Sequence, residues 1–199
     1  LVPPPDSSTQ WVVGDSRTIN WTKRGTIPTV KVEYYSPNQS LWVTPTGGAS
    51  VSGTTYTWNP LPDDMGTIVQ VRITNTASPA TKPTVNAVSA QFRIKGGFNI
   101  TKPALNDVAA VNLGTDGDSL KQEIRWQVKG TMALVKLEYN YGTGYTGITG
   151  ASSLNPNNLG GGNGNFLWLV PNTISNNVNV RVTSLDTGQT DVNDISDTF

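Results

Sequence analysis

Apolar and polar residues alternate along several short segments of this chain. Val30, Val32 and Tyr34 are separated by single polar residues, and residues 69–74 alternate in the same way. A period of two is typical of β-strands that have one buried face and one exposed face. We therefore expect strands near residues 16–23, 29–36, 40–44, 54–58, 67–75 and 87–95, joined by turns rich in Pro, Gly, Asn and Asp.

This pattern occurs twice. Residues 18–34 match residues 123–139, so that Trp21 and Trp126 occupy the same place in the two copies, and the match extends to Phe199. The second copy predicts strands near residues 122–129, 134–141, 164–169, 177–184 and 193–199. A repeat of about 100 residues has the size of a whole β-sandwich domain. The predicted fold class is all-β, with two tandem Ig-like antiparallel β-sandwich domains at residues 1–96 and 97–199.

The predicted join between the domains is short. Gly96 and Gly97 allow a sharp change of backbone direction but give little slack between the two sandwiches. The first copy continues through Ile94, whereas the second stops at Phe199, the equivalent of Phe92. We therefore expect the last strand of the second domain to be truncated.

Composition narrows the possible functions. The chain has no cysteine and no histidine, which excludes a thiol nucleophile, a Ser-His-Asp triad and an ordinary structural zinc site. Lys and Arg together number 14, as do Asp and Glu, so no basic surplus favours nucleic acid as a partner. The longest apolar stretches are far shorter than the ~20 residues that span a bilayer, so we expect no membrane insertion.

Six short motifs occur in a fixed order along the first copy. They are Trp11-x-x-Gly14-Asp15, Ile19-x-Trp21, Val30-x-Val32-x-Tyr34, Tyr56-x-Trp58, Val71-x-Ile73 and Ser89-x-x-Phe92-x-Ile94. This order resembles the Ig-like or fibronectin-III-like repeats of large secreted bacterial surface proteins, and is similar to the domain that begins Ser/Thr-rich, GPI-anchored fungal wall proteins. The resemblance spans nearly the whole of each copy and implies an extracellular, non-catalytic, structural or adhesive role.

Two functions follow from this resemblance and from the composition. The first is a non-catalytic structural module of a surface layer (S-layer), filament or adhesin, located outside the cell or on its surface, with neighbouring repeats or copies of itself as partners. The alternative is a carbohydrate-binding accessory module of a secreted enzyme, with cell-wall polysaccharide as the partner. Structural repeats keep equivalent surface residues in each copy, whereas a sugar platform is needed in one place. We expect no enzyme activity, because Asp63 and Asp64 are adjacent and would point apart.

Acidic clusters in the second copy are candidate calcium ligands. Asp116 and Asp118 lie in a glycine-containing stretch that is followed by Glu123, and oxygen ligands around a glycine turn suit calcium. Asp194 and Asp197 form the other candidate cluster. The alternatives are a polar hairpin for the first cluster and hydrogen bonds to turn amides for the second. No cofactor other than calcium is expected.

The aromatic residues fall into two groups. Those that recur in both copies at buried positions are expected to lie in the cores: Trp21, Trp58, Trp126 and Trp168. The others occur in one copy only, or at exposed positions or in loops: Trp11, Tyr35, Trp42, Tyr141 and Tyr145. Tyr141 and Tyr145 are the candidate ligand-binding residues, because exposed rings can stack on sugars. The alternative is that they pack against a neighbouring strand or domain.

Overall fold

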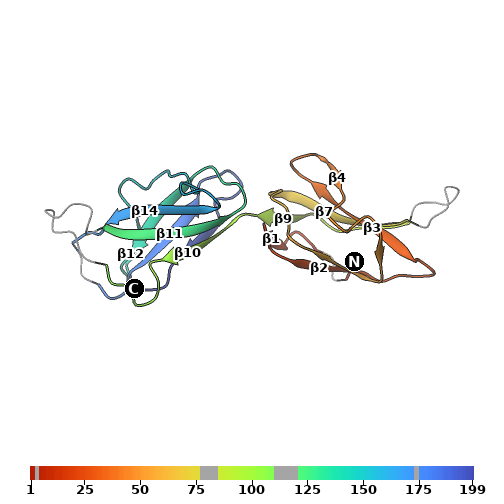
Figure 1. The fold of residues 1–199 in the computed structure, drawn as a ribbon, viewed down its shortest axis with the longest axis horizontal. Helices are drawn as coiled ribbons and strands as arrows, with labels where there is room; N and C mark the ends of the chain where they lie inside the picture. The colour runs from red at the N-terminus through yellow and green to blue at the C-terminus, as the bar shows by residue number, and fades with distance from the viewer. Residues whose placement is uncertain (3–4, 77–84, 110–120, 173–174) are drawn as a thin grey trace. The chain divides into compact units, whose positions relative to one another are not determined.

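The computed structural model describes residues 1–199 except 3–4, 77–84, 110–120 and 173–174 (Figure 1). The chain divides into two compact units, Leu1–Lys95 and Gly96–Phe199. The predicted all-β class is confirmed, because the described residues form strands, turns and loops but no helix. Accordingly, that part of the chain contains no helix suited to crossing a bilayer.

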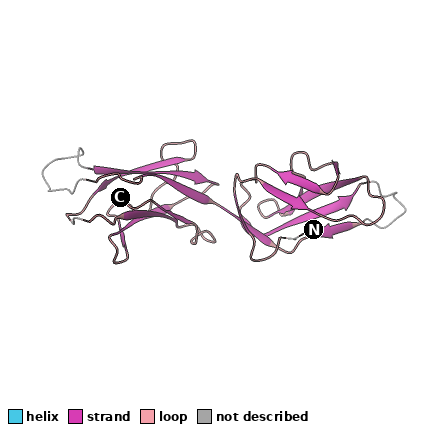
Figure 2. Ribbon diagram, turned by 90° about the horizontal axis from the view of Figure 1, so that it is seen from below, coloured by secondary structure: helices cyan, strands magenta, loops and turns pink. Residues whose placement is uncertain are grey.

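Unit 1 is a two-sheet sandwich (Figure 2). Its larger sheet has the order β1-β9-β7-β3-β4, with β5 added to β3 and β8 added to β7, and its smaller sheet pairs β2 with β6. All pairs are antiparallel except β1 with β9, which run parallel. The strands are β1 (Gln10–Val12), β2 (Arg17–Asn20), β3 (Thr29–Ser36), β4 (Leu41–Val43), β5 (Val51–Ser52), β6 (Thr55–Trp58), β7 (Gly66–Asn75), β8 (Asn86–Val88) and β9 (Phe92–Lys95).

Unit 2 is an antiparallel sandwich of two sheets, with the orders β10-β11-β14 and β13-β12-β15-β16. Its first strand joins a different sheet from the first strand of unit 1. β10 pairs with β11, whereas β1 pairs with β9. The strands are β10 (Gly97–Lys102), β11 (Lys121–Lys129), β12 (Val135–Asn140), β13 (Tyr145–Gly147), β14 (Asn163–Leu169), β15 (Asn179–Ser184) and β16 (Asn193–Ile195).

The alternating side chains build the cores as predicted. On β7, Val69 and Val71 are fully buried, whereas the intervening Gln70 is partly exposed. All four recurring tryptophans are at least 95% buried, since their exposed fractions are 5% for Trp21, 3% for Trp58, 1% for Trp126 and 2% for Trp168. Each large ring removes roughly 150–250 Å² from water, so these residues anchor the two cores.

One predicted strand is wrong in its extent. The sequence predicted a single strand over residues 87–95, but the structure has two short strands, β8 and β9, with Ser89 between them. The Ser89 hydroxyl accepts a hydrogen bond from the Val71 N–H (2.9 Å) and donates one to the Ala90 carbonyl (2.7 Å). A side chain thus takes the place of a backbone partner, which interrupts the ladder.

Unit 2 repeats this interruption at Ser196. Its hydroxyl accepts from the Val180 N–H (3.1 Å) and donates to the Asp197 carbonyl (2.8 Å). The strand predicted at 193–199 is therefore limited to β16. Beyond it, Phe199 exchanges backbone hydrogen bonds with Val178 at 2.9 and 3.2 Å. The two copies therefore share hydrogen-bond geometry as well as apolar spacing.

Candidate functional site

A cluster of charged and aromatic side chains lies on the outer face of the larger sheet in unit 1. The β3–β7 register places Glu33 opposite Arg72. The Glu33 carboxylate bonds to Arg72 Nη2 at 2.8 Å and to Lys31 Nζ at 2.7 Å, and its side chain is only 8% exposed. The Arg72 guanidinium lies 4.2 Å from the ring centroid of Trp42 on β4. This cation–π contact covers part of the tryptophan ring.

Unit 2 carries the same cluster on its equivalent strands. Glu138 on β12 bonds to Arg181 Nη2 at 2.7 Å and to Lys136 Nζ at 2.9 Å. The Arg181 guanidinium lies 3.7 Å from the ring centroid of Tyr145 on β13. We name these two groups the paired clusters: Lys31, Glu33, Arg72 and Trp42 in unit 1, and Lys136, Glu138, Arg181 and Tyr145 in unit 2.

Trp42 and Tyr145 are structural equivalents, which corrects the sequence-based grouping of them as unmatched aromatics. Tyr35 pairs with Trp42 across β3 and β4, and Asn140 pairs with Tyr145 across β12 and β13. Tyr35 and Asn140 hold the same place in the repeat. The connecting loops differ in length, so this match depends on strand register and is hidden in the sequence.

Both cluster carboxylates are held ionised. Burial alone would raise the pKa of Glu33, but hydrogen bonds and charge from Lys31 and Arg72 outweigh it, so the pKa lies below the usual range for glutamate. The pKa of Glu138 is lowered against burial in the same way by Lys136 and Arg181. A carboxylate poised for proton transfer near neutral pH needs a raised pKa, so neither glutamate fits that role.

The candidate ligand-binding tyrosines have different surroundings. One face of the Tyr145 ring lies under the Arg181 guanidinium. Tyr141 packs edge to face against Tyr139, with ring centroids 4.9 Å apart, and Tyr139 in turn packs on the buried Trp168. Both rings therefore make contacts within unit 2, as expected if they pack against neighbouring strands.

The calcium candidates are only partly described. Asp116 and Asp118 lie outside the described residues. Glu123 on β11 bonds to Arg125 Nε at 2.7 Å and to Lys102 Nζ at 3.7 Å, and the hydrogen bond from Arg125 is the main cause of its lowered pKa. Asp194 accepts a hydrogen bond from the Ile100 N–H at 2.7 Å.

Asp197, the remaining candidate, is exposed. Across the described ranges, no three His, Cys, Asp or Glu side chains gather closely enough to hold a metal ion. Asp194 thus bonds to an amide of strand β10, which is neither a metal nor the turn amide of the alternative, and the Glu123 carboxylate is engaged by cations.

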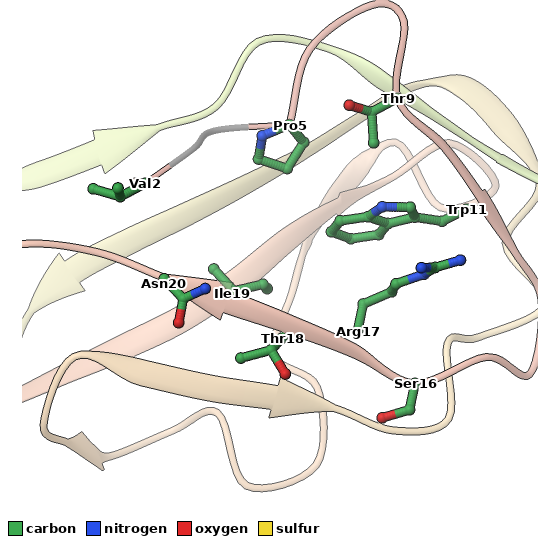
Figure 3. Close-up of a pocket in the computed structure, with 9 residues that line it drawn as sticks. All are labelled: Val2, Pro5, Thr9, Trp11, Ser16, Arg17, Thr18, Ile19 and Asn20. Atoms are coloured by element: carbon green, nitrogen blue, oxygen red, sulfur yellow. The ribbon is translucent and has the colours of Figure 1, made fainter.

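A pocket of about 370 Å³ lies between β1 and β2 in unit 1 (Figure 3). Trp11 lines it and is held by an edge contact with Trp58 (6.2 Å between centroids) and by packing on Phe92 (4.5 Å). Figure 3 shows the Trp11 ring and the Arg17 side chain facing the same hollow. The lining residues are Val2, Pro5, Thr9, Trp11, Ser16, Arg17, Thr18, Ile19 and Asn20.

This pocket combines an aromatic ring, a guanidinium and several hydroxyls, which are groups that can contact sugars or peptides. In the sequence, Trp11 is an aromatic with no counterpart in the second copy, but neither the pocket nor the part that Arg17 takes in it was predicted. The Arg17 guanidinium also bonds to Asp15 Oδ2 at 3.1 Å, which fixes its position beside the hollow. The missing counterpart of Trp11 was the only sequence signal for this site.

No protein-family model matches the chain, and a comparison with curated proteins finds no match either. Among solved structures, the fibronectin(III)-like modules of Clostridium thermocellum CbhA are similar at 14% identity over 96% of this chain and 88% of that chain, with a TM-score of 0.32. One chain of the crystal structure of mouse coronavirus receptor-binding domain complexed with its murine receptor is similar at 10% identity over 100% of this chain and 94% of that chain, with a TM-score of 0.28. These distant similarities carry no argument about function, and the description of the chain as β-sandwich rests on its own strands.

Proposed function

We propose that this chain is a non-catalytic, extracellular structural module of the kind that builds surface layers, filaments or adhesins. The observation that supports it is the presence of the paired clusters at equivalent positions in both units. A structural repeat keeps the same surface stabilisation in each copy, because each copy must fold and persist. A ligand platform is required once and has no reason to recur with its aromatic ring covered by arginine.

The carboxylates support the non-catalytic part of the proposal. Glu33 and Glu138 are engaged by cations of their own unit and have lowered pKa values. Asp64, which adjoins Asp63 in sequence, is 4% exposed and accepts a hydrogen bond from the Asn38 N–H at 3.1 Å. This hydrogen bond gives Asp64 a role in holding a turn.

Affinity electrophoresis in gels containing soluble cell-wall polysaccharides tests this proposal. We expect the chain to migrate as it does in gels without polysaccharide, because Trp42 and Tyr145 are each engaged by an arginine. Bovine serum albumin serves as a non-binding reference for pore effects. Retardation of the chain relative to this reference by one polysaccharide, growing with its concentration, would overturn the structural role in favour of carbohydrate binding.

The pocket beside Trp11 favours a second candidate function, the carbohydrate-binding accessory module. Trp11, Thr9 and Thr18 line one hollow, and Trp11 has no counterpart in the second copy. If this candidate is correct, Trp11→Ala should abolish the retardation and Trp42→Ala should leave it intact. The two variants therefore separate a specific site from general stickiness of aromatic residues.

A further inference from the structure

β14 is the longest edge strand in the described part of the chain. It comprises seven residues and contains no charged residue and no proline. Natural edge strands are usually short, charged or interrupted, because a free edge can pair with another chain. The three-residue edge strands β4, β8, β13 and β16 follow that rule. On β10, the Ile100 N–H is bound by Asp194.

The backbone of β14 alternates in direction between β11 and solvent. Gly162 and Val128 lie opposite each other in the continued β11–β14 register, and the Val128 N–H donates to the Gly162 carbonyl at 2.8 Å. Hydrogen-bonded pairs recur at every second residue of an antiparallel ladder. Phe166 and Trp168 therefore direct their backbone groups toward β11, and Asn165, Leu167 and Leu169 direct theirs toward the free edge.

Part of this edge is already covered by a loop of the same unit. The Asn158 side-chain amide donates to the Asn165 carbonyl at 2.8 Å, and its oxygen accepts from the Asn165 N–H at 2.8 Å. The carboxamide thus imitates the backbone of a neighbouring strand. The loop covers the free edge of β14 only as far as Asn165.

Leu167 and Leu169 form the open edge. Within the described residues, their N–H and carbonyl groups have no hydrogen-bond partner, and their side chains are 48% and 52% exposed. An apolar edge with unsatisfied backbone groups is a template for strand addition.

We propose that this open edge pairs with the same edge of a second copy of the chain, antiparallel and about a two-fold axis at Trp168. Leu167 of one copy then exchanges backbone hydrogen bonds with Leu169 of the other. The inference rests on the proposed structural function and names the surface through which copies associate. It joins the β10-β11-β14 sheets of two molecules into one continuous sheet.

The occupant is a second copy because the edge is its own complement. Leu167 and Leu169 each offer one backbone donor and one backbone acceptor. When a second copy of the strand runs antiparallel, its Leu169 and Leu167 meet these groups in turn. The same surface therefore binds itself, as in any isologous contact. The charged residues on β11 that flank the open edge are also complementary between two copies. On β11, Glu123 lies opposite Leu167 and Lys121 lies opposite Leu169, so each row of the combined sheet would begin with glutamate from one copy and end with lysine from the other.

The interface is small, so association of single chains should be weak and should depend on concentration. Sedimentation velocity over a range of concentrations tests it. We expect the unaltered chain to form dimers at high concentration and Leu167→Lys/Leu169→Lys to weaken association by at least about tenfold. Leu41→Lys is the matched control, because Leu41 is a 48% exposed leucine on an edge strand of unit 1; this variant should dimerise like the parent.

Cysteine cross-linking tests the register, since the chain has no cysteine of its own. Under mild oxidation, a mixture of Leu167→Cys and Leu169→Cys chains should form covalent dimers faster than either variant alone. A parent that stays monomeric at all concentrations, or that associates equally well with both lysines present, overturns this edge pairing. If the double lysine variant associates as well as the parent, only the edge pairing is wrong and the proposed structural function still stands. If a polysaccharide retards the chain in affinity electrophoresis, the structural function itself is wrong.

Discussion

Gly164 on β14 lies directly opposite Trp126 on β11, and the indole ring of Trp126 rests against it. A Cβ at residue 164 would overlap the Trp126 ring and the Pro156 carbonyl oxygen. With the ring in this place, Trp126 Nε1 donates to the Pro156 carbonyl at 2.9 Å. One glycine therefore allows both the packing of the ring and the satisfaction of its buried N–H.

Gly164→Ala should destabilise unit 2 by about 1–3 kcal/mol, because the added methyl group overpacks a filled site. Urea unfolding followed by tryptophan fluorescence measures this change. Gly147→Ala is the control, since a Cβ at that position on β13 meets nothing within 4 Å. A Gly164→Ala chain as stable as the control would show that the ring does not rest on residue 164.

Trp126→Phe should cost more stability than Trp21→Phe by about 1 kcal/mol. Both substitutions shorten a buried ring, but only Trp126 loses a hydrogen bond. Trp21 Nε1 is buried and has no hydrogen-bond partner within the described residues. Calorimetric melting of each variant gives the comparison. Truncation to alanine at either position should cost about 3–5 kcal/mol, so a Trp→Ala variant that melts like the parent would contradict the core assignment.

Ser89→Ala should destabilise unit 1 by about 1–3 kcal/mol, because it leaves the buried Val71 N–H without its acceptor. Ser196→Ala should have an effect of the same size on unit 2, where Val180 loses its acceptor. Ser52→Ala, at an exposed position, serves as the control. Chemical denaturation midpoints measure all three. If only one of the two serine variants loses stability, the copies do not share this hydrogen-bond arrangement.

Acid should weaken both units through the paired clusters. The pKa values of Glu33 and Glu138 are lowered in the folded chain, so their stabilisation is complete above the ordinary glutamate pKa of 4.5 and is lost as pH falls through the lower folded values. Glu138→Gln should therefore reduce the loss of unit 2 stability between neutral and acidic pH. An unchanged pH profile in this variant would show that the Arg181–Glu138 pair contributes nothing.

Calcium should leave the melting temperature of unit 2 unchanged. Glu123 is bonded to Arg125 and Lys102, and Asp194 is bonded to the Ile100 amide, so neither carboxylate awaits a metal ion. Ions that bind only the folded state raise its melting temperature by mass action. Differential scanning calorimetry with added calcium and with chelator makes the measurement, and a rise with calcium would restore the metal site.

The sequence was sufficient for strands whose alternation is uninterrupted. The strand predicted at 29–36 coincides with β3, because its apolar residues Val30, Val32 and Tyr34 fall at every second position and are buried. β1 and β10 were not predicted. β1 has only three residues, and the partner of each strand is chosen by the rest of the sandwich. Strand register, which no local pattern reveals, makes Trp42 and Tyr145 equivalent.

The site residues show the same limit. The recurring tryptophans could be assigned to the core because one property, burial at every second residue, decides their place. The pocket beside Trp11 depends on β1 leaving β2 to pair with β9, which is a choice between two possible partners. The hydrogen bond from Trp126 Nε1 to the Pro156 carbonyl likewise depends on the path of a loop.

The parallel pairing of β1 with β9 has a mechanical consequence for unit 1. Tension applied to the chain before Gln10 and after Lys95 would pull these two strands in opposite directions along their own axes. Their hydrogen bonds would then be strained together, in shear, and would not open one after another as in a zipper. In unit 2 the first strand, β10, pairs antiparallel with the next strand, β11, and not with the last strand of its unit. The two repeats should therefore unfold at different forces.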